Sequence, residues 1–540
     1  MKYLFILLAS IPGAAFAQNY EPEVYASEDT AIVQTESGKV RGYIYDDTFI
    51  FKGIPYAYAE RFMPPGDAKS WDDIRFMGYY GATCPLDFEP IKARGNGVGM
   101  FALQNDWGYP HEDCHSLNIW TQGINDNNKR PVIVWIHGGG YDYGSSHELP
   151  FYDGKNLSKK GDVVYVSVNH RLNILGFLDL SAYGEKYKYT PNLGLLDLVA
   201  ALKWIKRNIS GFGGDPENIT VFGQSGGGGK ITALLNSPVA DGLFRQAVVM
   251  SGSFTSEYIP QERSGAVAAR VLEELDIDES GVDEILEVSY DDLLQAGKRA
   301  LAALRQEEED RVGTAGGLGW GPVADQYFLP FPMFGDEVLK MVDDVNIMIG
   351  TTKTEFSAAA SYMTGDDMEK TKNQIAERYK GKADEYMEAV RRAYPDTEKA
   401  SDYLDIDFMF RPGAVRDANA LVKGGHNNTY MYLFKWESPV NDGSMKAMHC
   451  MELPFFFNNI YLGKELTGGG KEAYQLAGVV SNSLINFART GNPGTAGMPK
   501  WPRYTLDKGA TMVIDQESEV KYHFDKELLK IAVPGLIPDY

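Results

Sequence analysis

The chain has 540 residues, of which 44% are hydrophobic and 12% aromatic, and its formal net charge is -22. This apolar content is too high for a disordered chain and is sufficient for a large buried core. Nucleic acids are bound by clusters of Lys and Arg side chains, and the sequence has no such cluster. We therefore expect no nucleic-acid partner.

The first residues of the chain have the pattern of a secretory signal peptide. Lys2 supplies a positive charge, Tyr3–Ala9 is a short apolar run, and Ala15 and Ala17 form a small-x-small cleavage pattern. A membrane-spanning helix needs about 20 apolar residues, and this run is far shorter. We expect cleavage after Ala17 and a secreted or periplasmic mature protein. No later segment is long and apolar enough to span a membrane.

Apolar runs and segments of helical spacing follow one another along the chain. Continuous apolar runs are typical of strands that are buried in a parallel sheet, and they occur at Pro131–Ile136, Val163–Val168 and Ile219–Phe222. Leu193–Ile209 has helical spacing, and Arg263–Arg311 is helical and acidic, as expected for a cap region with solvated faces. With no linker or internal repeat between them, residues 18–540 are predicted to form a single α/β domain.

A Gly-x-Ser-x-Gly motif directly follows the third apolar run. It consists of Gly223, Ser225 and Gly227, and a helix-capable segment follows from Ile231. This strand–turn–helix context is typical of a nucleophile elbow, in which a tight turn presents the serine hydroxyl at a helix N-terminus. A phosphate-binding loop would need glycine in place of Gln224 and Ser or Thr in place of Ile231. The motif predicts that Ser225 is a nucleophile, with an ordinary glycine-rich loop as the alternative.

Three consecutive glycines follow the first apolar run, within the segment His137–Tyr141. The pattern fits the His-Gly-Gly-Gly element whose backbone N–H groups stabilise the oxyanion in lipases and esterases. Glycine is needed there because side chains would block the approach of the substrate oxygen. An ordinary glycine turn is the alternative, and the Ser225 motif downstream favours the oxyanion element.

These motifs resemble those of the type-B carboxylesterases, the cholinesterase-like group of the α/β-hydrolases, over nearly the whole mature chain. Further similar segments are Phe51–Ala57, Glu112–Ile119, Asn192–Asp197, Phe212–Pro216 and Trp501–Tyr504. The resemblance implies a central, mostly parallel, twisted sheet flanked by helices, with helical cap insertions. It also implies that the N–H groups of Gly139, Gly140 and Gly226 form the oxyanion hole, although the family often has alanine where Gly226 stands.

The resemblance also indicates the catalytic base. In α/β-hydrolases the acid and then the histidine follow the serine along the chain. His449 is followed by an acidic residue, Leu-Pro and aromatic residues, as in the histidine loop of the family. The rival, His426, lies among glycines and asparagines, a composition typical of a surface turn. We predict that His449 takes the serine proton and returns it to the leaving alcohol.

The acid is expected between Ser225 and His449, after a strand. Glu355 follows the apolar run Val345–Gly350 and resembles the acid loop of the family. It would hold the imidazole in the correct tautomer and stabilise its cation. Asp325 is the rival, in a stretch that the family uses as pocket and core structure.

Cysteine usage depends on the compartment. Export would place the chain where disulfides persist, and its three cysteines are Cys84, Cys114 and Cys450. One pair and one free thiol are therefore expected. The resemblance to the carboxylesterases implies that Cys84 and Cys114 form the disulfide and that Cys450 stays free.

Two segments have the spacing of metal sites. His111 and His115 spell the zinc-protease motif His-Glu-x-x-His, which works only on a helix. Because Pro110 precedes the motif and a strand-like stretch follows it, we expect no zinc. Asp276–Glu287 has the length of a calcium loop, but Asp283 stands where such loops usually carry an apolar residue. Calcium binding there stays open, and no other metal or cofactor is expected.

The predicted triad of Ser225, Glu355 and His449 indicates hydrolysis of small to medium neutral carboxylic esters through an acyl-enzyme. Gln224 stands where cholinesterases carry glutamate, so neutral esters should be preferred over choline esters. An amidase, a carbamate hydrolase or an acyltransferase would use the same groups, and the sequence does not separate these activities. A cholinesterase-like binding module is a weaker alternative, because such relatives lose the serine.

Overall fold

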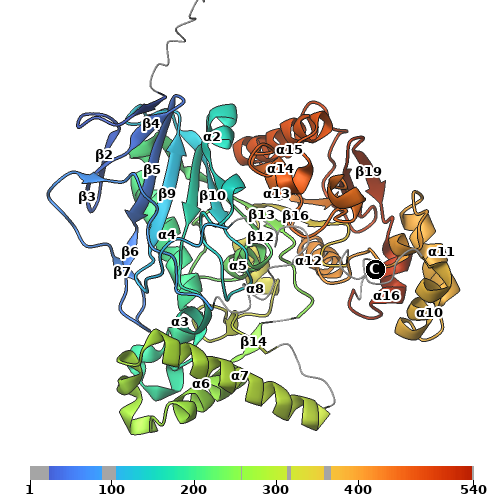
Figure 1. The fold of residues 1–540 in the computed structure, drawn as a ribbon, viewed down its shortest axis with the longest axis horizontal. Coiled ribbons are helices and arrows are strands. Elements are labelled where there is room, and N and C mark those ends of the chain that lie inside the picture. The colour runs from blue at the N-terminus through green and yellow to red at the C-terminus, as the bar shows by residue number, and fades with distance from the viewer. Residues whose placement is uncertain (1–22, 88–104, 257, 313–317, 358–366, 538–540) are drawn as a thin grey trace, which may run out of the picture.

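The structure is a computed structural model that describes residues 23–87, 105–256, 258–312, 318–357 and 367–537. The predicted signal peptide and its cleavage site lie outside the described residues. The largest feature is a 12-stranded sheet (Figure 1). Its strands are, in spatial order, β1 (Val24–Tyr25), β4 (Tyr43–Tyr45), β5 (Thr48–Pro55), β9 (Ser116–Thr121), β11 (Val164–Val168), β10 (Arg130–Ile136), β12 (Gly214–Gln224), β13 (Gln246–Met250), β16 (Asn346–Thr352), β17 (Thr429–Phe434), β18 (Ala510–Ile514) and β19 (Glu519–Tyr522).

The strands from β11 to β18 in this order run parallel, and the strands beyond them pair in antiparallel fashion. Every residue of β10 and β11 is buried, as their continuous apolar sequences predict. In register, Val134 of β10 pairs with Val166 of β11 and with Val221 of β12. The sheet confirms the predicted α/β class with a mostly parallel centre.

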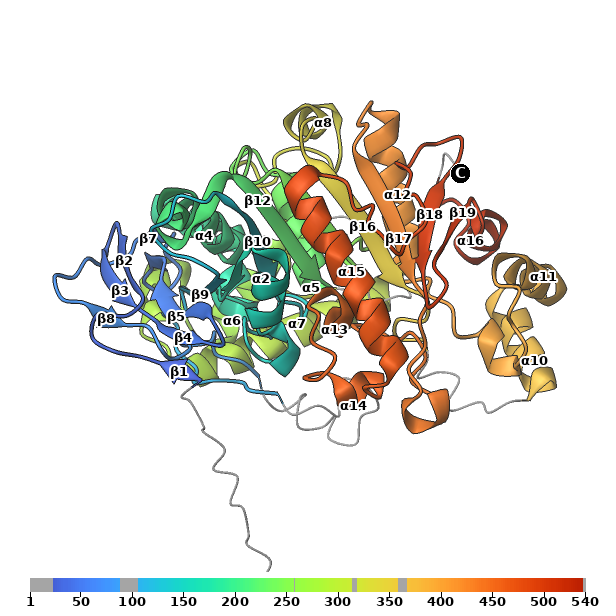
Figure 2. The ribbon, with the colours of Figure 1, turned by 90° about the horizontal axis from the view of Figure 1, so that it is seen from above.

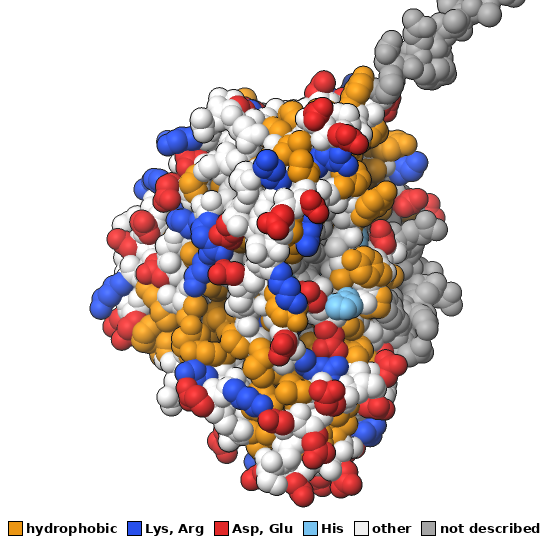
Figure 3. All heavy atoms as spheres, turned by 90° about the vertical axis from the view of Figure 1, so that its left-hand side faces the viewer, with side chains coloured by type: hydrophobic (Ala, Val, Ile, Leu, Met, Phe, Trp, Pro, Cys, Tyr) orange, Lys and Arg blue, Asp and Glu red, His pale blue; other side chains and the backbone are white. Residues whose placement is uncertain are grey.

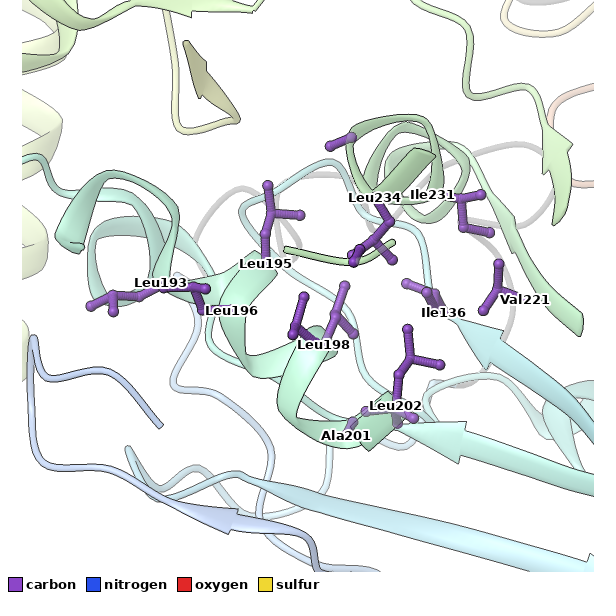
Figure 4. Close-up of a cluster of buried hydrophobic side chains, with 14 of the residues drawn as sticks. Ile136, Leu193, Leu195, Leu196, Leu198, Ala201, Leu202, Val221, Ile231 and Leu234 are labelled. Carbon is purple, nitrogen blue, oxygen red and sulfur yellow. The ribbon is translucent and has the colours of Figure 1, made fainter. Parts of the chain in front are cut away.

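One face of the sheet is covered by α4 (Leu193–Asn208), α5 (Gly226–Leu235) and α12 (Arg411–Lys423). Figure 4 shows Leu202 of α4 and Leu234 of α5 directed toward Ile136 and Val221 of the sheet. Each such side chain contributes about 1.5–3 kcal/mol when it is fully buried. The predicted helix from Leu193 ends one residue early, because the chain continues as a 3-10 turn over Ile209–Phe212.

The other face is covered by α2 (Lys155–Gly161), α13 (Leu453–Phe456) and α15 (Lys471–Thr490). Figure 2 shows α15 lying over the sheet and running in roughly the direction of its strands. Because successive side chains of a strand point to opposite faces, Trp135 packs into this second cluster while its neighbour Ile136 belongs to the first. Both faces therefore have aromatic or aliphatic cores that hold the strand ends in place.

The predicted acidic cap region contains α6 (Gln261–Glu274), the 3-10 helix Glu279–Leu286 and α7 (Tyr290–Val312), which lie together at one end of the molecule (Figure 1). A separate cluster joins α10 (Met368–Arg378), α11 (Ala383–Ala393) and α16 (Lys526–Ala532). The remaining short elements are β2 (Ile32–Thr35), β3 (Gly38–Arg41), β6 (Ala57–Tyr58), β7 (Gly66–Asp67), β8 (Arg75–Phe76), α3 (Asn173–Phe177), β14 (Ile259–Pro260), β15 (Val323–Ala324), α8 (Asp336–Met341) and α14 (Lys464–Thr467).

The surface is mixed in charge on the face drawn in Figure 3, and apolar side chains gather in a patch at its lower left. Basic side chains on that face stand singly or in small groups between acidic ones. Among the helices of the described ranges, none is long and apolar enough to cross a membrane.

Candidate active site

The predicted catalytic residues all follow the carboxyl ends of parallel strands. The segment His137–Tyr141, here called the oxyanion loop, follows β10, and Ser225 follows β12. Glu355 follows β16, and His449 lies in the connection that leaves β17. Parallel strands bring these ends to one edge of the sheet, which is where open α/β sheets bind their ligands.

Ser225 stands at the sharp turn between β12 and α5. Its backbone angles, φ 58° and ψ -126°, are strained for a residue with a side chain. The Ser225 N–H donates to the Met250 carbonyl at 2.8 Å, and the Gly229 N–H donates to the Ser225 carbonyl at 2.9 Å. A Cβ at Gly227 would lie 2.1 Å from the Ile136 carbonyl oxygen, so this position requires glycine. The turn has the geometry expected of a nucleophile elbow.

The structure brings Glu355 and His449 into direct contact. Nδ1 of His449 donates to Oε2 of Glu355, and the backbone N–H of His449 donates to the Glu355 carbonyl at 3.1 Å. The other carboxylate oxygen, Oε1, accepts from the Ser251 hydroxyl at 2.6 Å and from the Thr352 N–H at 2.7 Å. Both side chains are buried. With Nδ1 engaged, Nε2 of the imidazole is the nitrogen left for proton exchange, and in this structure it accepts from the Gln224 amide at 3.2 Å.

Gln224 and two aromatic rings surround the imidazole. The ring centroids of Phe356 and Phe410 lie 4.2 Å and 5.3 Å from that of His449. Nε2 of Gln224 is 3.2 Å from Nε2 of His449, and Oε1 of Gln224 accepts from the Cys450 thiol at 2.8 Å. Among the hydrogen bonds of the described residues there is none between the Ser225 hydroxyl and His449. Catalytic hydrogen bonds of this kind often tighten only when substrate binds.

The rival histidine and the rival acid have structural contacts. His426 is buried, contrary to the surface turn expected from its sequence, because its ring bridges the Thr429 hydroxyl and the Val345 carbonyl at 2.8 Å each. Oδ1 of Asp325 accepts from three backbone N–H groups, those of residues 327, 328 and 329, at 2.6–3.2 Å. A further histidine downstream of the serine, His523, lies 3.0 Å from the Leu506 carbonyl.

The oxyanion loop lies against the start of α5. Gly139 and Gly140 have φ of +83° and +62°, the region that favours glycine. A Cβ at Gly226 would lie 2.0 Å from the Gly140 carbonyl oxygen, which shows how closely the loop approaches the elbow. Within the described part of the chain, the N–H groups of Gly139, Gly140 and Gly226 donate no hydrogen bond. Three donors near Ser225 are thus available for a substrate oxygen.

Lys230, which no sequence motif indicated, is fully buried in α5 behind the oxyanion loop. Its Nζ donates to the carbonyl of His137, the first residue of the loop, at 3.2 Å. Burial lowers the pKa of Lys230 to about 7, and the nearby Glu148 acts in the opposite direction. Burial also raises the pKa of Glu148 to about 7. A charged residue in an otherwise apolar helix after the elbow is the signal that could have revealed it.

Lys230 should make stability depend on pH. In the unfolded chain a lysine titrates at about 10.5, so between about pH 7 and pH 10 the unfolded state binds more protons there than the folded state. The free energy of unfolding should therefore rise with pH across this window, by at most about 1.4 kcal/mol per pH unit. Lys230→Met should remove that slope, which urea unfolding at several pH values measures.

The matched control for this experiment is Lys203→Met, which removes an exposed lysine from α4. It reports the general effect of one lost positive charge. Equal slopes in the wild type and in Lys230→Met would contradict the predicted titration.

All three cysteines are buried thiols in this structure, so the predicted disulfide between Cys84 and Cys114 is not formed. The two thiols lie beside each other, and this contact together with burial raises the pKa of Cys114 well above its usual range. The Cys84 sulfur also accepts from the Leu172 N–H at 3.2 Å. Cys450 is a free thiol beside Gln224, as predicted.

The two metal-like segments have other contacts. Nε2 of His115 lies 3.2 Å from the buried Asp197, and Asp283 is ion-paired with Lys186 at 2.6 Å. Over the ranges that the structure describes, no group of three or more His, Cys, Asp or Glu residues is arranged to hold a metal ion.

Comparisons with known proteins agree with this geometry. The sequence model of the "Carboxylesterase family" matches residues 29–531. The chain is 34% identical to para-nitrobenzyl esterase of Bacillus subtilis (strain 168), over 93% of this chain and 99% of that protein. It is 31% identical to phenmedipham hydrolase of Pseudarthrobacter oxydans, over 90% of this chain and 95% of that protein.

A solved structure is also similar over most of the chain. It is an esterase from anaerobic Clostridium hathewayi that can hydrolyze aliphatic aromatic polyesters. The TM-score is 0.81 at 34% identity, and the match covers 94% of this chain and 98% of that one.

Proposed function

The chain belongs to the carboxylesterase family and is a carboxylic ester hydrolase of the α/β-hydrolase fold, and we propose that it cleaves neutral esters through Ser225, His449 and Glu355. The observation that carries the proposal is the hydrogen bond from His449 to Glu355 beside the strained Ser225 turn. Nucleophile, base and orienting acid are the three groups that acyl transfer through serine requires.

The reaction proceeds in two halves. The Ser225 oxygen attacks the ester carbonyl carbon while Nε2 of His449 takes the hydroxyl proton. The N–H groups of Gly139, Gly140 and Gly226 stabilise the oxyanion, and Glu355 stabilises the imidazolium. When the tetrahedral intermediate collapses, the alcohol leaves with the proton from His449. Water then attacks the acyl-serine by the same route, which releases the carboxylic acid and restores the serine.

Gln224 favours neutral over choline esters. Its amide replaces a carboxylate that would attract a quaternary ammonium, and it is held between His449 and Cys450. We expect the ratio of kcat/KM for a choline ester to that for its uncharged isostere, with carbon in place of nitrogen, to stay below about tenfold. In Gln224→Glu this ratio should rise. A strong choline preference in the wild type would mean that another group binds the cation.

A panel of substrates that share one acyl group separates the related activities. An amidase, a carbamate hydrolase or an acyltransferase would use the same three groups on a different leaving group or acceptor. Amide and carbamate analogues with the same acyl group, and an added alcohol as acceptor, therefore belong beside the esters. Faster cleavage of the amide or carbamate than of the ester would reject a preference for esters.

Export is the second part of the proposal. Residues 1–17 act as a signal peptide, and in the oxidising compartment Cys84 and Cys114, already in thiol contact, form a disulfide. Closing this loop should stabilise the fold by roughly 3.5 kcal/mol on the chain-entropy model. Intact mass and thiol titration of the exported protein should give an N-terminus at Gln18 and Cys450 as the free thiol. A retained leader, or three titratable thiols, would contradict this expectation.

A further inference from the structure

A cavity of about 220 Å³ opens beside the oxyanion loop. Its near end contains Gly140 of the loop and Gly229, whose N–H donates to the Ser225 carbonyl. Four aromatic side chains line it, those of Tyr141, Phe254, Tyr258 and Trp320, and its polar lining includes Asp142, Thr232 and Ser256. A Cβ at Gly229 would lie 2.5 Å from the Phe254 ring and from the Tyr141 hydroxyl, so the glycine lets these rings line the cavity closely.

Asp417 of α12 also lines this cavity, although its side chain is only 2% exposed. One carboxylate oxygen, Oδ1, accepts from Nε and Nη2 of Arg416 at 3.0 Å and 2.8 Å. The other, Oδ2, is buried and has no hydrogen-bond partner among the described residues. The Ser253 side chain lies beside the carboxylate and acts to lower its pKa. Among the described residues, Ser253 Oγ has no partner in hydrogen-bonding geometry.

An unsatisfied buried oxygen is unusual, because a buried polar group without a partner costs about 1–3 kcal/mol. Arg416 does not need Oδ2, since its Nη1 and Nη2 also donate to the Thr255 and Phe254 carbonyls at 3.0 Å and 2.9 Å. Because Asp417 lines the cavity, a ligand bound there can supply the missing donor.

The cavity is expected on the acyl side of an ester bound at Ser225. The leaving alcohol must face His449, which gives it a proton. The residues that contact the imidazole are Gln224, Glu355, Phe356 and Phe410, and none of them lines the cavity. With the carbonyl oxygen at the N–H of Gly140, the acyl group is the part of the ester that extends past Gly229 into the cavity.

We propose that Asp417 is a specificity-determining residue that selects esters whose acyl group carries a neutral hydrogen-bond donor, such as a hydroxyl on an aromatic ring. The inference rests on the proposed ester hydrolysis at Ser225 and names its acyl class. A neutral donor fits better than an ammonium, because Arg416 already balances the charge of Asp417 and an added cation would be buried unpaired. Burial raises the pKa of Asp417, and a donor at Oδ2 would favour the charged carboxylate.

The test uses 4-nitrophenyl esters of phenylacetic acids that carry a hydroxyl or a methoxy group at the 3 or 4 position. Methoxy keeps the oxygen and removes the donor. In the full-length enzyme we expect kcat/KM to favour the better-placed hydroxyl over its methoxy analogue by roughly ten- to a hundredfold. Asp417→Asn keeps the shape and the bond to Arg416 but turns an NH₂ group toward the cavity. The ratio of hydroxyl to methoxy should then fall toward one.

Asp525→Asn is the matched control, because Asp525 is also a buried aspartate, paired with Arg411 at 2.7 Å, and does not line the cavity. Its ratio should equal that of the wild type. Both substrates are assayed on the same preparation of each variant, so the fraction of folded enzyme cancels from the ratio. A wild-type ratio near one, or an equal ratio in Asp417→Asn, would overturn the inference while ester hydrolysis stands.

A second substrate pair checks the acyl assignment. Acetate esters of 4-hydroxybenzyl and 4-methoxybenzyl alcohol carry the same groups on the alcohol, and their ratio should not respond to Asp417→Asn. A response there would overturn the placement of the donor on the acyl group. If no ester in either series is hydrolysed, the proposed function fails together with the inference, which is a distinct outcome.

Discussion

Ser225→Ala should lower kcat/KM for a neutral ester by roughly 10⁵- to 10⁶-fold. Without Oγ no acyl-enzyme forms, and the remaining rate comes from the oxyanion donors and substrate binding alone. Combining Ser225→Ala with His449→Ala should add little, because the residues act as one unit. Single-turnover and steady-state rates on one neutral ester measure both effects. Near-wild-type hydrolysis by Ser225→Ala would reject the mechanism.

Glu355→Gln tests the acid in the same series and should lose about 10⁴-fold in kcat. In the wild type, one oxygen of the Glu355 carboxylate accepts from His449, and the other accepts from Ser251 and Thr352. Glutamine has one acceptor oxygen, so it cannot serve both sides, and the imidazole loses its fixed tautomer. Asp325→Asn is the matched control, because the rival acid caps backbone N–H groups instead. A larger loss of kcat in Asp325→Asn than in Glu355→Gln would mean that Asp325, and not Glu355, is the catalytic acid.

The parts of the fold that could be predicted are those in which local pattern and burial agree. The apolar run Pro131–Ile136 became β10, and Ile219–Phe222 became the end of β12, because continuous apolar residues only suit a strand covered on both faces. The elbow at Ser225 was equally visible, since its glycines are required by backbone contacts a few ångströms away.

The parts that could not be predicted depend on partners far along the chain. His426 lies in a segment with the composition of a surface turn, yet its ring is buried by the Val345 carbonyl, which is distant in sequence. Lys230 and Asp417 are buried charged residues beside the site, whereas the general expectation for Lys and Asp is exposure. Their roles follow from neighbours that only the folded chain brings together.

At Gly226 the family pattern and the structure differ on whether alanine fits after the catalytic serine. The carboxylesterases that the sequence resembles often have alanine after the serine, yet a Cβ here would lie 2.0 Å from the Gly140 oxygen and 2.5 Å from its Cα and carbonyl carbon. These are backbone atoms, which cannot rotate aside as the end of a side chain can. An alanine must therefore push the oxyanion loop away from Ser225, and with it the N–H of Gly140.

Gly226→Ala should consequently reduce kcat by roughly 10²- to 10³-fold, the usual loss for one oxyanion donor. Binding of the ground-state ester uses this donor less than the transition state does, so KM should change little. Gly265→Ala in α6 is the control, because nothing lies within 4 Å of its Cβ position. That helix-interior change should leave kcat unaltered and stabilise the fold by about 0.5–1 kcal/mol. If Gly226→Ala keeps kcat within a few-fold of the wild type, the Gly140 N–H is not part of the oxyanion hole.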